Sequence, residues 1–226
     1  MYGHTTVAEV MTTDVGTVDE RTPFKEIARL LATRRVSAVP VVDDDGRVVG
    51  VVSETDLLRK EEHQAPWRSR RLANRGTLSE RRKAAGTVAA ELMTAPPVCI
   101  GLGASLPTAA RAMTDHDVTR LIVLNPDGRI AGIVTRSDLL RVFLTPDEQI
   151  RQRVTRRLIR DALWDDPFAV RADVQDGVVT LTGELERRSL ISIAIQFART
   201  VDGVVGVRSD LSYLTDDTDI ELHQPG

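Results

Sequence analysis

The fold is decided by a stretch that reads Val36-Ser37-Ala38-Val39-Pro40-Val41-Val42, passes through Gly46, and closes with Gly50-Val51-Val52-Ser53-Glu54-Thr55-Asp56-Leu57-Leu58. A second copy reads Val118-Thr119-Arg120-Leu121-Ile122-Val123-Leu124, passes through Gly128, and closes with Gly132-Ile133-Val134-Thr135-Arg136-Ser137-Asp138-Leu139-Leu140. The copies lie 82 residues apart at every position, and the same offset aligns Met11-Thr12 with Met93-Thr94. The first two thirds of the chain is therefore an ungapped internal repeat.

Each copy predicts a short strand, a helix and two further strands. The helix is indicated by apolar residues at the spacing of one helical face, namely Phe24, Ile27, Leu30 and Leu31, and then Leu106, Ala109, Ala110 and Met113. The predicted strands are Val15–Val18, Ala38–Val42 and Val48–Val52, and then Val98–Ile100, Leu121–Leu124 and Ile130–Val134. Asp-Gly between two apolar runs is a hairpin signal, so residues 43–46 and 125–128 are predicted turns. The acidic triplet 43–45 fits a solvated turn better than a cation site.

The motif Gly-x-x-Ser/Thr-x-x-Asp follows each hairpin, as Gly50, Ser53 and Asp56 and again as Gly132, Thr135 and Asp138. Ser or Thr followed three residues later by an acid is a capping box, which satisfies N–H groups at a helix start. The same helix start suits a phosphate, because N–H groups, a hydroxyl and the helix dipole all favour an anion there. In that interpretation the hydroxyl faces phosphate and the Asp accepts hydrogen bonds from ribose. The residues alone leave both interpretations open.

A flat wall for a base is predicted in the apolar strand that precedes each hairpin. Ala38 and Val39 occupy this position in the first copy, and Arg120 and Leu121 occupy it in the second. Together with the motif residues, these side chains are the candidate ligand-binding residues.

The repeat resembles a CBS domain pair, also called a Bateman module, over residues 5–144. The resemblance is carried by the Met-Thr opening, the apolar strand before the hairpin and the duplicated Gly-x-x-Ser/Thr-x-x-Asp motif. It implies tandem βαββα repeats that pack about a pseudo-twofold axis and form two clefts for adenosine-containing ligands, such as AMP, ADP, ATP, NAD or S-adenosylmethionine. It also implies ligand sensing rather than catalysis, and a homodimer formed through the CBS module.

The two predicted clefts differ in charge. Glu54 follows the Ser of the first motif and would repel a phosphate, whereas Arg136 follows the Thr of the second and would attract one. Arg120 would add a cation to the second base wall, with a solvated side chain as the competing interpretation. We therefore expect the cleft of Thr135 and Asp138 to bind ligand in preference to the cleft of the first motif.

Residues 147–216 predict a separate domain with the element order α-β-β-α-β. Thr145-Pro146 starts a helix as N-cap and first helical residue. Strands Ala169–Val174 and Val178–Leu185, a helix over Ser189–Thr200 and a strand Val204–Leu211 follow. The domain resembles a BON domain, through Asp-Gly-Val-Val-Thr-Leu-Thr-Gly-Glu-Leu at 176–185 and Val-Asp-Gly-Val-Val-Gly-Val at 201–207.

The BON resemblance implies a link of the protein with osmotic stress, and phospholipid binding. The first helix carries five arginines that could contact anionic lipid, namely Arg151, Arg153, Arg156, Arg157 and Arg160. A solvated helix face is the simpler interpretation. Many BON proteins are exported, and this sequence predicts no export signal. Lipid binding is therefore a minor expectation.

A basic insert, residues 60–86, separates the two copies. Arginines near Trp67 could bind nucleic acid or polyphosphate, but Glu61, Glu62 and Glu80 interrupt the positive charge. An exposed linker anchored by Trp67 explains the stretch more simply, although its arginines could also reach phosphates in a neighbouring cleft.

Composition places the chain among ordinary globular proteins. Hydrophobic residues make up 42% and charged residues 28%, and the net charge is −3, so no global positive field indicates nucleic acid or membrane as partner. The single cysteine, Cys99, cannot form an internal disulfide, and no Cys/His cluster has zinc spacing. A cytoplasmic location without catalytic metal is expected.

The sequence as a whole predicts a cytoplasmic, non-enzymatic regulatory protein. Its predicted parts are CBS repeat 1 (residues 1–59), the insert (60–86), CBS repeat 2 (87–144), a BON domain (147–216) and a disordered acidic tail (217–226). An adenosine-containing ligand in the CBS clefts would alter what the BON domain or a partner surface presents. The alternatives are a ligand-free structural or oligomerising stress-response protein, and a membrane- or phospholipid-associated adaptor that uses the BON domain.

Overall fold

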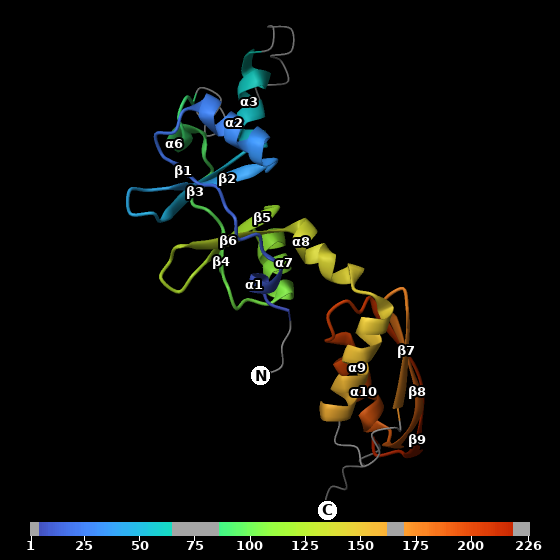
Figure 1. The fold of residues 1–226 in the computed structure, drawn as a ribbon. Helices are drawn as coiled ribbons and strands as arrows, with labels where there is room; N and C mark the ends of the chain where they lie inside the picture. Colours follow the sequence, from blue (N-terminus) through green and yellow to red (C-terminus); the bar gives the residue numbers. More distant parts are fainter. Residues whose placement is uncertain (1–4, 65–85, 162–169, 219–226) are drawn as a thin grey trace, which may run out of the picture. The chain divides into compact units, whose positions relative to one another are not determined.

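Figure 1 shows the fold of the protein as a computed structural model. It describes residues 5–64, 86–161 and 170–218. The chain forms two compact units. One comprises Thr6–Arg136, and the other comprises Ser137–Gly226 with Met1–Thr5.

The first unit contains one three-stranded sheet from each copy of the repeat. The elements of the first copy are α1 (Val7–Val10), β1 (Val18–Asp19), α2 (Phe24–Arg34), β2 (Ala38–Val42), β3 (Val48–Ser53) and α3 (Glu54–Gln64). Those of the second are α6 (Ala89–Leu92), β4 (Cys99–Gly101), α7 (Leu106–Asp115), β5 (Arg120–Leu124), β6 (Ile130–Thr135) and α8 (Arg136–Leu140). In each sheet the short first strand runs parallel to the second, which pairs antiparallel with the third.

Local sequence explains these elements. On α2, Ile27 and Leu31 are buried, one helical turn apart. Ser105 caps α7, because its hydroxyl accepts a hydrogen bond from the Thr108 N–H at 3.3 Å. Gly46 and Gly128 hold φ values of 77° and 79° in the hairpin turns, a conformation that glycine adopts without steric cost.

The two copies exchange their opening segments about a pseudo-twofold axis. Isolated antiparallel bridges join the two copies. Each bridge has a counterpart in which both residues are replaced by their equivalents in the other copy, 82 residues away. These bridges are Thr6–Ser105 with Val88–Pro23, Thr12–Ile133 with Thr94–Val51, and Arg47 with its own counterpart Arg129. The exchange extends to the core, because Ala89 and Leu92 of α6 are buried against the first copy's α2 and sheet.

The second unit forms an α-β-β-α-β domain after the short 3-10 helix η2 (Arg141–Leu144). Its elements are α9 (Asp147–Asp161), β7 (Val170–Gln175), β8 (Val178–Arg187), α10 (Ser189–Arg199) and β9 (Gly206–Thr215). The sheet order is β7-β8-β9, with β7 antiparallel and β9 parallel to the central strand.

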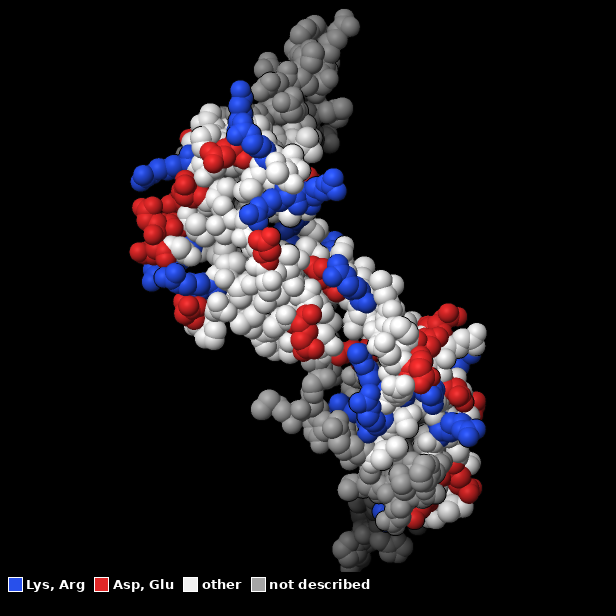
Figure 2. Space-filling model, viewed as in Figure 1, with Lys and Arg blue, Asp and Glu red and all other residues white. Residues whose placement is uncertain are grey.

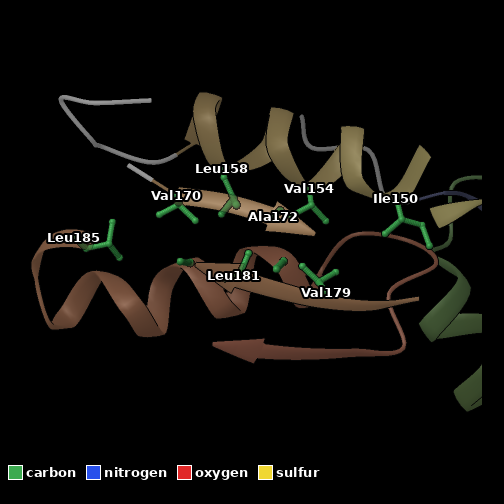
Figure 3. Close-up of a cluster of buried hydrophobic side chains, with 10 residues drawn as sticks. Ile150, Val154, Leu158, Val170, Ala172, Val179, Leu181 and Leu185 are labelled. Atoms are coloured by element: carbon green, nitrogen blue, oxygen red, sulfur yellow. The ribbon is translucent and has the colours of Figure 1, made fainter. Parts of the chain in front are cut away.

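The core of the second unit lies between α9, α10 and the sheet. Figure 3 shows Ile150, Val154 and Leu158 projecting from α9 toward the strands. Alternate strand residues meet them, as period-two burial requires, and the small residues Ala194 and Ala198 let α10 approach closely. This cluster contains no residue of the first unit.

The structure confirms the predicted fold class of tandem βαββα repeats followed by an αββαβ domain. The short helices α1 and α6 were not predicted. The last strand begins two residues later and ends four residues later than the predicted Val204–Leu211. Asp217, the first residue of the predicted tail, accepts hydrogen bonds from the Ser189 N–H and hydroxyl at 2.9 and 2.6 Å. Most of the basic insert, including Trp67, lies outside the described residues, as do residues 219–226.

Candidate ligand-binding cleft

The first Gly-x-x-Ser-x-x-Asp motif lies where β3 ends and α3 begins. The Asp56 carboxylate accepts hydrogen bonds from the Ser53 N–H at 2.9 Å and from the Ser53 hydroxyl at 2.6 Å. The Asp56 N–H donates to the Ser53 hydroxyl at 3.3 Å. These reciprocal bonds form the capping box expected from the spacing. Asp56 is only 5% exposed, so the hydrogen bonds from Ser53 serve a nearly buried side chain.

A cleft of about 220 Å³ opens beside this motif and is built by both copies of the repeat. The first copy contributes Val51, Ser53, Thr55 and Asp56. The second contributes the segment after its Met-Thr opening and the start of β5 with the turn before it, namely Thr94, Pro96, Pro97, Val98, Asp117, Val118, Thr119, Arg120 and Ile122. The exchange of opening segments described above is what brings these two groups together.

Arg120 is the cation of this cleft. Its guanidinium donates to the Ser37 hydroxyl at 3.1 Å and to the Thr119 hydroxyl at 3.3 Å. Burial lowers the pKa of the Arg120 guanidinium, and the charges of Glu54 and Asp56 raise it. Because arginine remains protonated at neutral pH, the cleft combines a fixed positive charge with the carboxylate of Asp56.

This position of Arg120 differs from the sequence-based expectation. Arg120 was expected to accompany Thr135 and Asp138 of its own copy, whereas the structure places it with the motif of the other copy. At the equivalent position of the first copy stands Ala38, which carries no charge. The exchange between copies therefore gives the Arg120 charge to the cleft of Ser53 and Asp56, which was predicted to be the less favourable one for a phosphate.

Of the residues expected to form the base walls, Arg120 lines the cleft, whereas Leu121, Ala38 and Val39 do not. Leu121 is fully buried and Val39 nearly so, and Val39 belongs to the core of its own copy. Ala38 is also buried. In a strand, successive side chains point to opposite faces, so the residues that line the cleft from β5 are Arg120 and Ile122 rather than Leu121. The period-two pattern contained this signal, but the sequence did not indicate which face of β5 borders the cleft.

The second motif is divided between the two compact units. Thr135 ends β6 in the first unit, and Asp138 lies in α8 in the second, where it is 6% exposed and pairs with Arg141 at 3.3 Å. Arg136 donates from its guanidinium to the Val118 carbonyl and from its backbone N–H to the Thr119 carbonyl, both at 3.1 Å. Its predicted contact with a phosphate stays a prediction.

The charges in the Ser53/Asp56 cleft favour a ligand with both a hydroxylated part and an anionic part. Asp56 and Asp117 offer carboxylate acceptors, Arg120 offers a donor, and Val51, Val118 and Ile122 offer apolar surface. Within the described residues, no group of His, Cys, Asp and Glu is arranged to hold a metal ion. Figure 2 shows acidic and basic side chains interspersed on the visible face of the first unit, so no broad charged field surrounds these elements there.

Fold and cleft together define a protein with a tandem, pseudo-twofold α/β module and a small appended α/β domain. Family comparison agrees with this class. The CBS domain matches at residues 7–63 and 88–145, and the BON domain matches at residues 146–215. The chain therefore belongs to the CBS domain family and carries a C-terminal BON domain.

Two curated relatives from Arabidopsis thaliana are the chloroplastic CBS domain-containing proteins CBSX1 and CBSX2. CBSX1 is 32% identical over 155 residues, covering 62% of this chain and 64% of its own length. CBSX2 is 31% identical over 156 residues, covering 63% and 65%. The chain thus spans slightly less than two thirds of either relative.

Two solved structures of CBSX2 are similar to part of this chain. A crystal structure of CBSX2 from Arabidopsis thaliana has a TM-score of 0.50 and 30% identity, covering 66% of this chain and 99% of that one. A crystal structure of CBSX2 in complex with AMP has a TM-score of 0.49 and 30% identity, covering 63% and 97%. In the part of this chain that the structure describes, no helix is long and apolar enough to cross a membrane.

Proposed function

We propose that this protein is a non-enzymatic regulator that binds an adenosine-containing ligand in the cleft of Ser53, Asp56 and Arg120. The observation that carries the proposal is the convergence of a buried carboxylate, an arginine and apolar strand residues from two copies of the repeat on one cleft. The relationship to CBSX2, which has been crystallised with AMP, supports adenosine as the ligand class.

The chemistry of the cleft suits the three parts of a nucleotide. Asp56 would accept hydrogen bonds from ribose hydroxyls, Val118 and the β5 residue Ile122 would contact the base, and Arg120 would pair with phosphate. Because the cleft is smaller than the roughly 300–1,000 Å³ of a drug-sized ligand site, it fits the nucleoside portion, with further phosphates or a second moiety directed to solvent. AMP, ADP, ATP, NAD and S-adenosylmethionine share that portion.

The double role of Asp56 provides a means of signalling. The carboxylate that would hold ribose also caps α3 through Ser53. A ligand that competes for it would weaken or reshape this cap and change the first turn of α3. We propose that the BON domain or a partner protein responds to this change, in a cytoplasmic homodimer formed through the CBS module.

Calorimetric titration of the full chain with adenosine and then AMP tests the proposal. Asp56→Asn should lower the affinity for both ligands about tenfold or more, because a charge-assisted hydrogen bond contributes roughly 1.5–3 kcal/mol. Arg120→Ala should lower the affinity for AMP and leave the affinity for adenosine nearly unchanged, because only AMP carries a phosphate. Asp138→Asn is the matched variant of the second copy. If Asp138→Asn lost binding and Asp56→Asn retained it, the proposed site would be wrong, and the ligand would bind at Thr135 and Asp138 instead.

A ligand-free structural or oligomerising role is the second candidate function. The complete capping box at Ser53 and Asp56 favours it, because the motif needs no ligand to satisfy its hydrogen bonds. In that case neither millimolar AMP, ADP or ATP nor NAD or S-adenosylmethionine would raise the melting temperature of the full chain. A rise that disappears in Asp56→Asn would exclude the purely structural role.

The non-enzymatic assignment accounts for one group of relatives. A homoserine O-acetyltransferase from Methanohalophilus mahii is 28% identical over 133 residues, but the match covers only 23% of that protein. The shared part is the size of a regulatory module, so an acetyltransferase activity is not part of the proposal.

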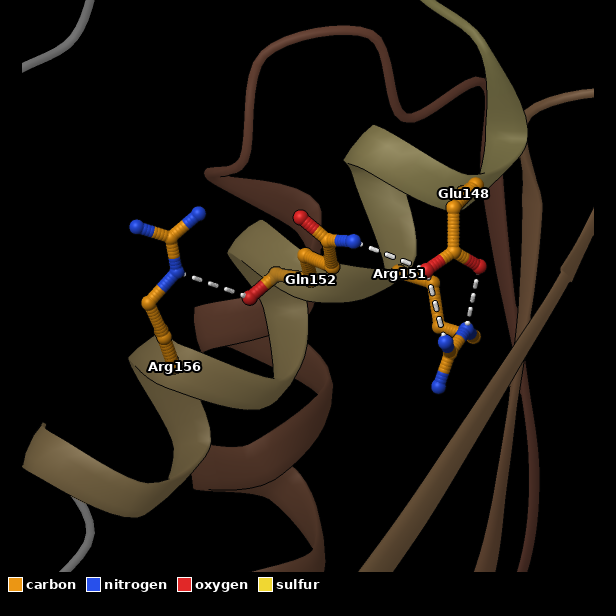
Figure 4. A network of polar contacts seen from close by, with 4 residues as sticks. All are labelled: Glu148, Arg151, Gln152 and Arg156. Atoms are coloured by element: carbon orange, nitrogen blue, oxygen red, sulfur yellow. Dashed lines mark hydrogen bonds and ion pairs between the residues drawn. The ribbon is translucent and has the colours of Figure 1, made fainter.

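The lipid-binding alternative stays a prediction that concerns α9. Figure 4 shows Arg151 held by Glu148, with distances of 2.7 and 2.9 Å, while Arg156 donates to the Gln152 carbonyl at 3.3 Å. These contacts occupy part of the positive charge along the helix. Sedimentation with anionic vesicles tests this alternative directly, and an absence of binding would remove it.

A further inference from the structure

The strand β9 forms one edge of the BON sheet. It pairs with β8 in a parallel register from Gly206 opposite Val178 to Thr215 opposite Arg187, and no other strand of the described residues pairs with it. It is 10 residues long and contains neither proline nor lysine. Natural proteins usually protect such an edge with a short strand, a bulge, proline or charged side chains, especially lysine. In β9 the exposed charges of Arg208 and Asp210 are the device present, so a strand that pairs with this edge must offer complementary charges.

The backbone of β9 shows which residues face the open side. The Val205 N–H donates to the Gly177 carbonyl at 2.8 Å, and the Thr215 carbonyl accepts from the Arg188 N–H at 3.0 Å, so the odd-numbered residues direct their polar groups toward β8. Backbone polar groups alternate between the two sides of a strand. The even-numbered residues therefore present their N–H and C=O groups to the open edge, and these are Gly206, Arg208, Asp210, Ser212 and Leu214.

We propose that this edge binds β9 of a second copy of the chain in an antiparallel pair centred on Ser209. In this register Arg208 of each copy lies opposite Asp210 of the other, and both are exposed on the face of the sheet away from the helices. Gly206 lies opposite Ser212. Each of these even-numbered pairs exchanges two backbone hydrogen bonds, and the two sheets join into one.

Charge selects this register over its neighbours. A shift by one pair in one direction sets Arg208 opposite Arg208 of the second copy, and a shift in the other direction sets Asp210 opposite Asp210. Opposite charges across a strand pair stabilise it, and like charges destabilise it. A shift by a single residue would set inward-facing backbone groups against outward-facing ones. The sequence Arg208-Ser209-Asp210 is thus complementary to itself in one arrangement.

The odd-numbered side chains also match in this register. Val207 lies opposite Leu211 of the second copy, and both are partly buried against the core of the unit. Val205 lies opposite Tyr213, and these side chains are 64% and 41% exposed in the single chain. Pairing extends the apolar layer across the joint and covers two of the large exposed apolar side chains of the unit.

Site-specific cross-linking of the full chain tests the pairing, in a Cys99→Ser background that removes the exposed native thiol. Ser209 faces Ser209 of the second copy in a non-hydrogen-bonded pair, where Cα atoms lie about 4.5 Å apart, within the span of a disulfide. Ser209→Cys should therefore form a disulfide-linked dimer under mild oxidation. Ser212→Cys is the matched control on the same strand, because it faces Gly206.

Charge reversal supplies the second test. Asp210→Arg, added to the Ser209→Cys chain, places arginines opposite one another and should reduce cross-linking at least several-fold. Arg208→Asp should do the same with carboxylates. The double reversal Arg208→Asp/Asp210→Arg restores complementary pairs and should restore cross-linking, as should a mixture of the two single variants. Circular dichroism checks that each variant is folded.

The pairing would be overturned if Ser209→Cys cross-linked no faster than Ser212→Cys, or if Asp210→Arg had no effect on it. Faster cross-linking of Ser212→Cys would show a different register and also contradict the proposal. These outcomes do not depend on the CBS cleft. Adenosine binding can fail with the β9 pairing intact, and the reverse also holds.

Discussion

Two glycines at equivalent positions show how closely the copies approach. A Cβ atom at Gly132 would lie 2.6 Å from the Met11 sulfur and 2.7 Å from the Thr12 carbonyl oxygen, whereas a Cβ at Gly50 would meet only the Met93 side chain among its three nearest atoms. The motif glycine is therefore required by the exchanged opening segment of the other copy. This explains why Met-Thr and Gly-x-x-Ser/Thr-x-x-Asp are repeated with the same spacing.

We expect Gly132→Ala to destabilise the first unit more than Gly50→Ala. The backbone carbonyl of Thr12 cannot move aside as a methionine side chain can, and overpacking typically costs about 1–3 kcal/mol. Urea denaturation of both variants measures the difference. Met93→Ala should partly rescue Gly50→Ala, while Met11→Ala should rescue Gly132→Ala poorly. Equal losses for the two glycine variants would contradict this account.

Asp216 supplies a pH-dependent contribution to the second unit. Hydrogen bonds from Thr218 and Arg188 lower the pKa of its carboxyl from 3.8 to about 2. Because the folded-state pKa is the lower one, the stabilisation is complete above the unfolded-state value and is lost as the pH falls toward 2. The melting temperature of Asp216→Asn should thus be below that of the wild type at neutral pH, and the difference should vanish near pH 2. A difference independent of pH would contradict this assignment.

At the scale of elements, one carboxylate joins the first helix of the second unit to a hairpin. Asp147 begins α9 and accepts hydrogen bonds from the N–H groups of Asp176 and Gly177 at 2.8 and 2.9 Å. Both turn residues have positive φ, 52° and 74°. The carboxylate thus holds a turn that the backbone does not favour for an aspartate.

Asp147→Asn should destabilise the second unit by about 1–2 kcal/mol, because the two N–H groups bond to different carboxylate oxygens and the amide replaces one of these acceptors with an NH2 donor. Thermal unfolding followed by circular dichroism measures the loss. The matched control is Glu148→Gln, whose contacts with Arg151 and Gln152 of the same helix are exposed. A loss for Glu148→Gln as large as that for Asp147→Asn would show that the turn contact is unimportant.

Elements were predictable where the signal is local. Helical spacing and Asp-Gly turns identified α2, α7 and both hairpins, because these patterns depend on neighbours within a few residues. The helices α1 and α6 were missed because each has only four residues and is stabilised by contacts with the other copy. Arg120 was assigned to the wrong neighbours for the same reason. Its identity as a cleft cation was predictable, but the partner copy depends on how the repeats exchange.

At the scale of the whole molecule, the two compact units contain separate hydrophobic clusters among the described residues. One joins Val18, Ile27 and neighbouring residues to Leu92, and the other runs from Ile150 to Ala198. The domain order was predictable from the repeat and from the change of pattern after Thr145. The lining of the Ser53/Asp56 cleft was not predictable, because it depends on side chains from both copies.

Separate cores predict two unfolding transitions in calorimetry of the full chain, since cooperativity follows shared packing. Gly132→Ala should lower only the transition of the first unit, and Asp147→Asn only that of the second. A bound adenosine ligand should raise the first-unit transition by mass action. If ligand also raises the other transition, and if Asp56→Asn removes both effects, occupancy of the cleft is energetically coupled to the BON domain. A single transition that moves in every variant would contradict the two-core description.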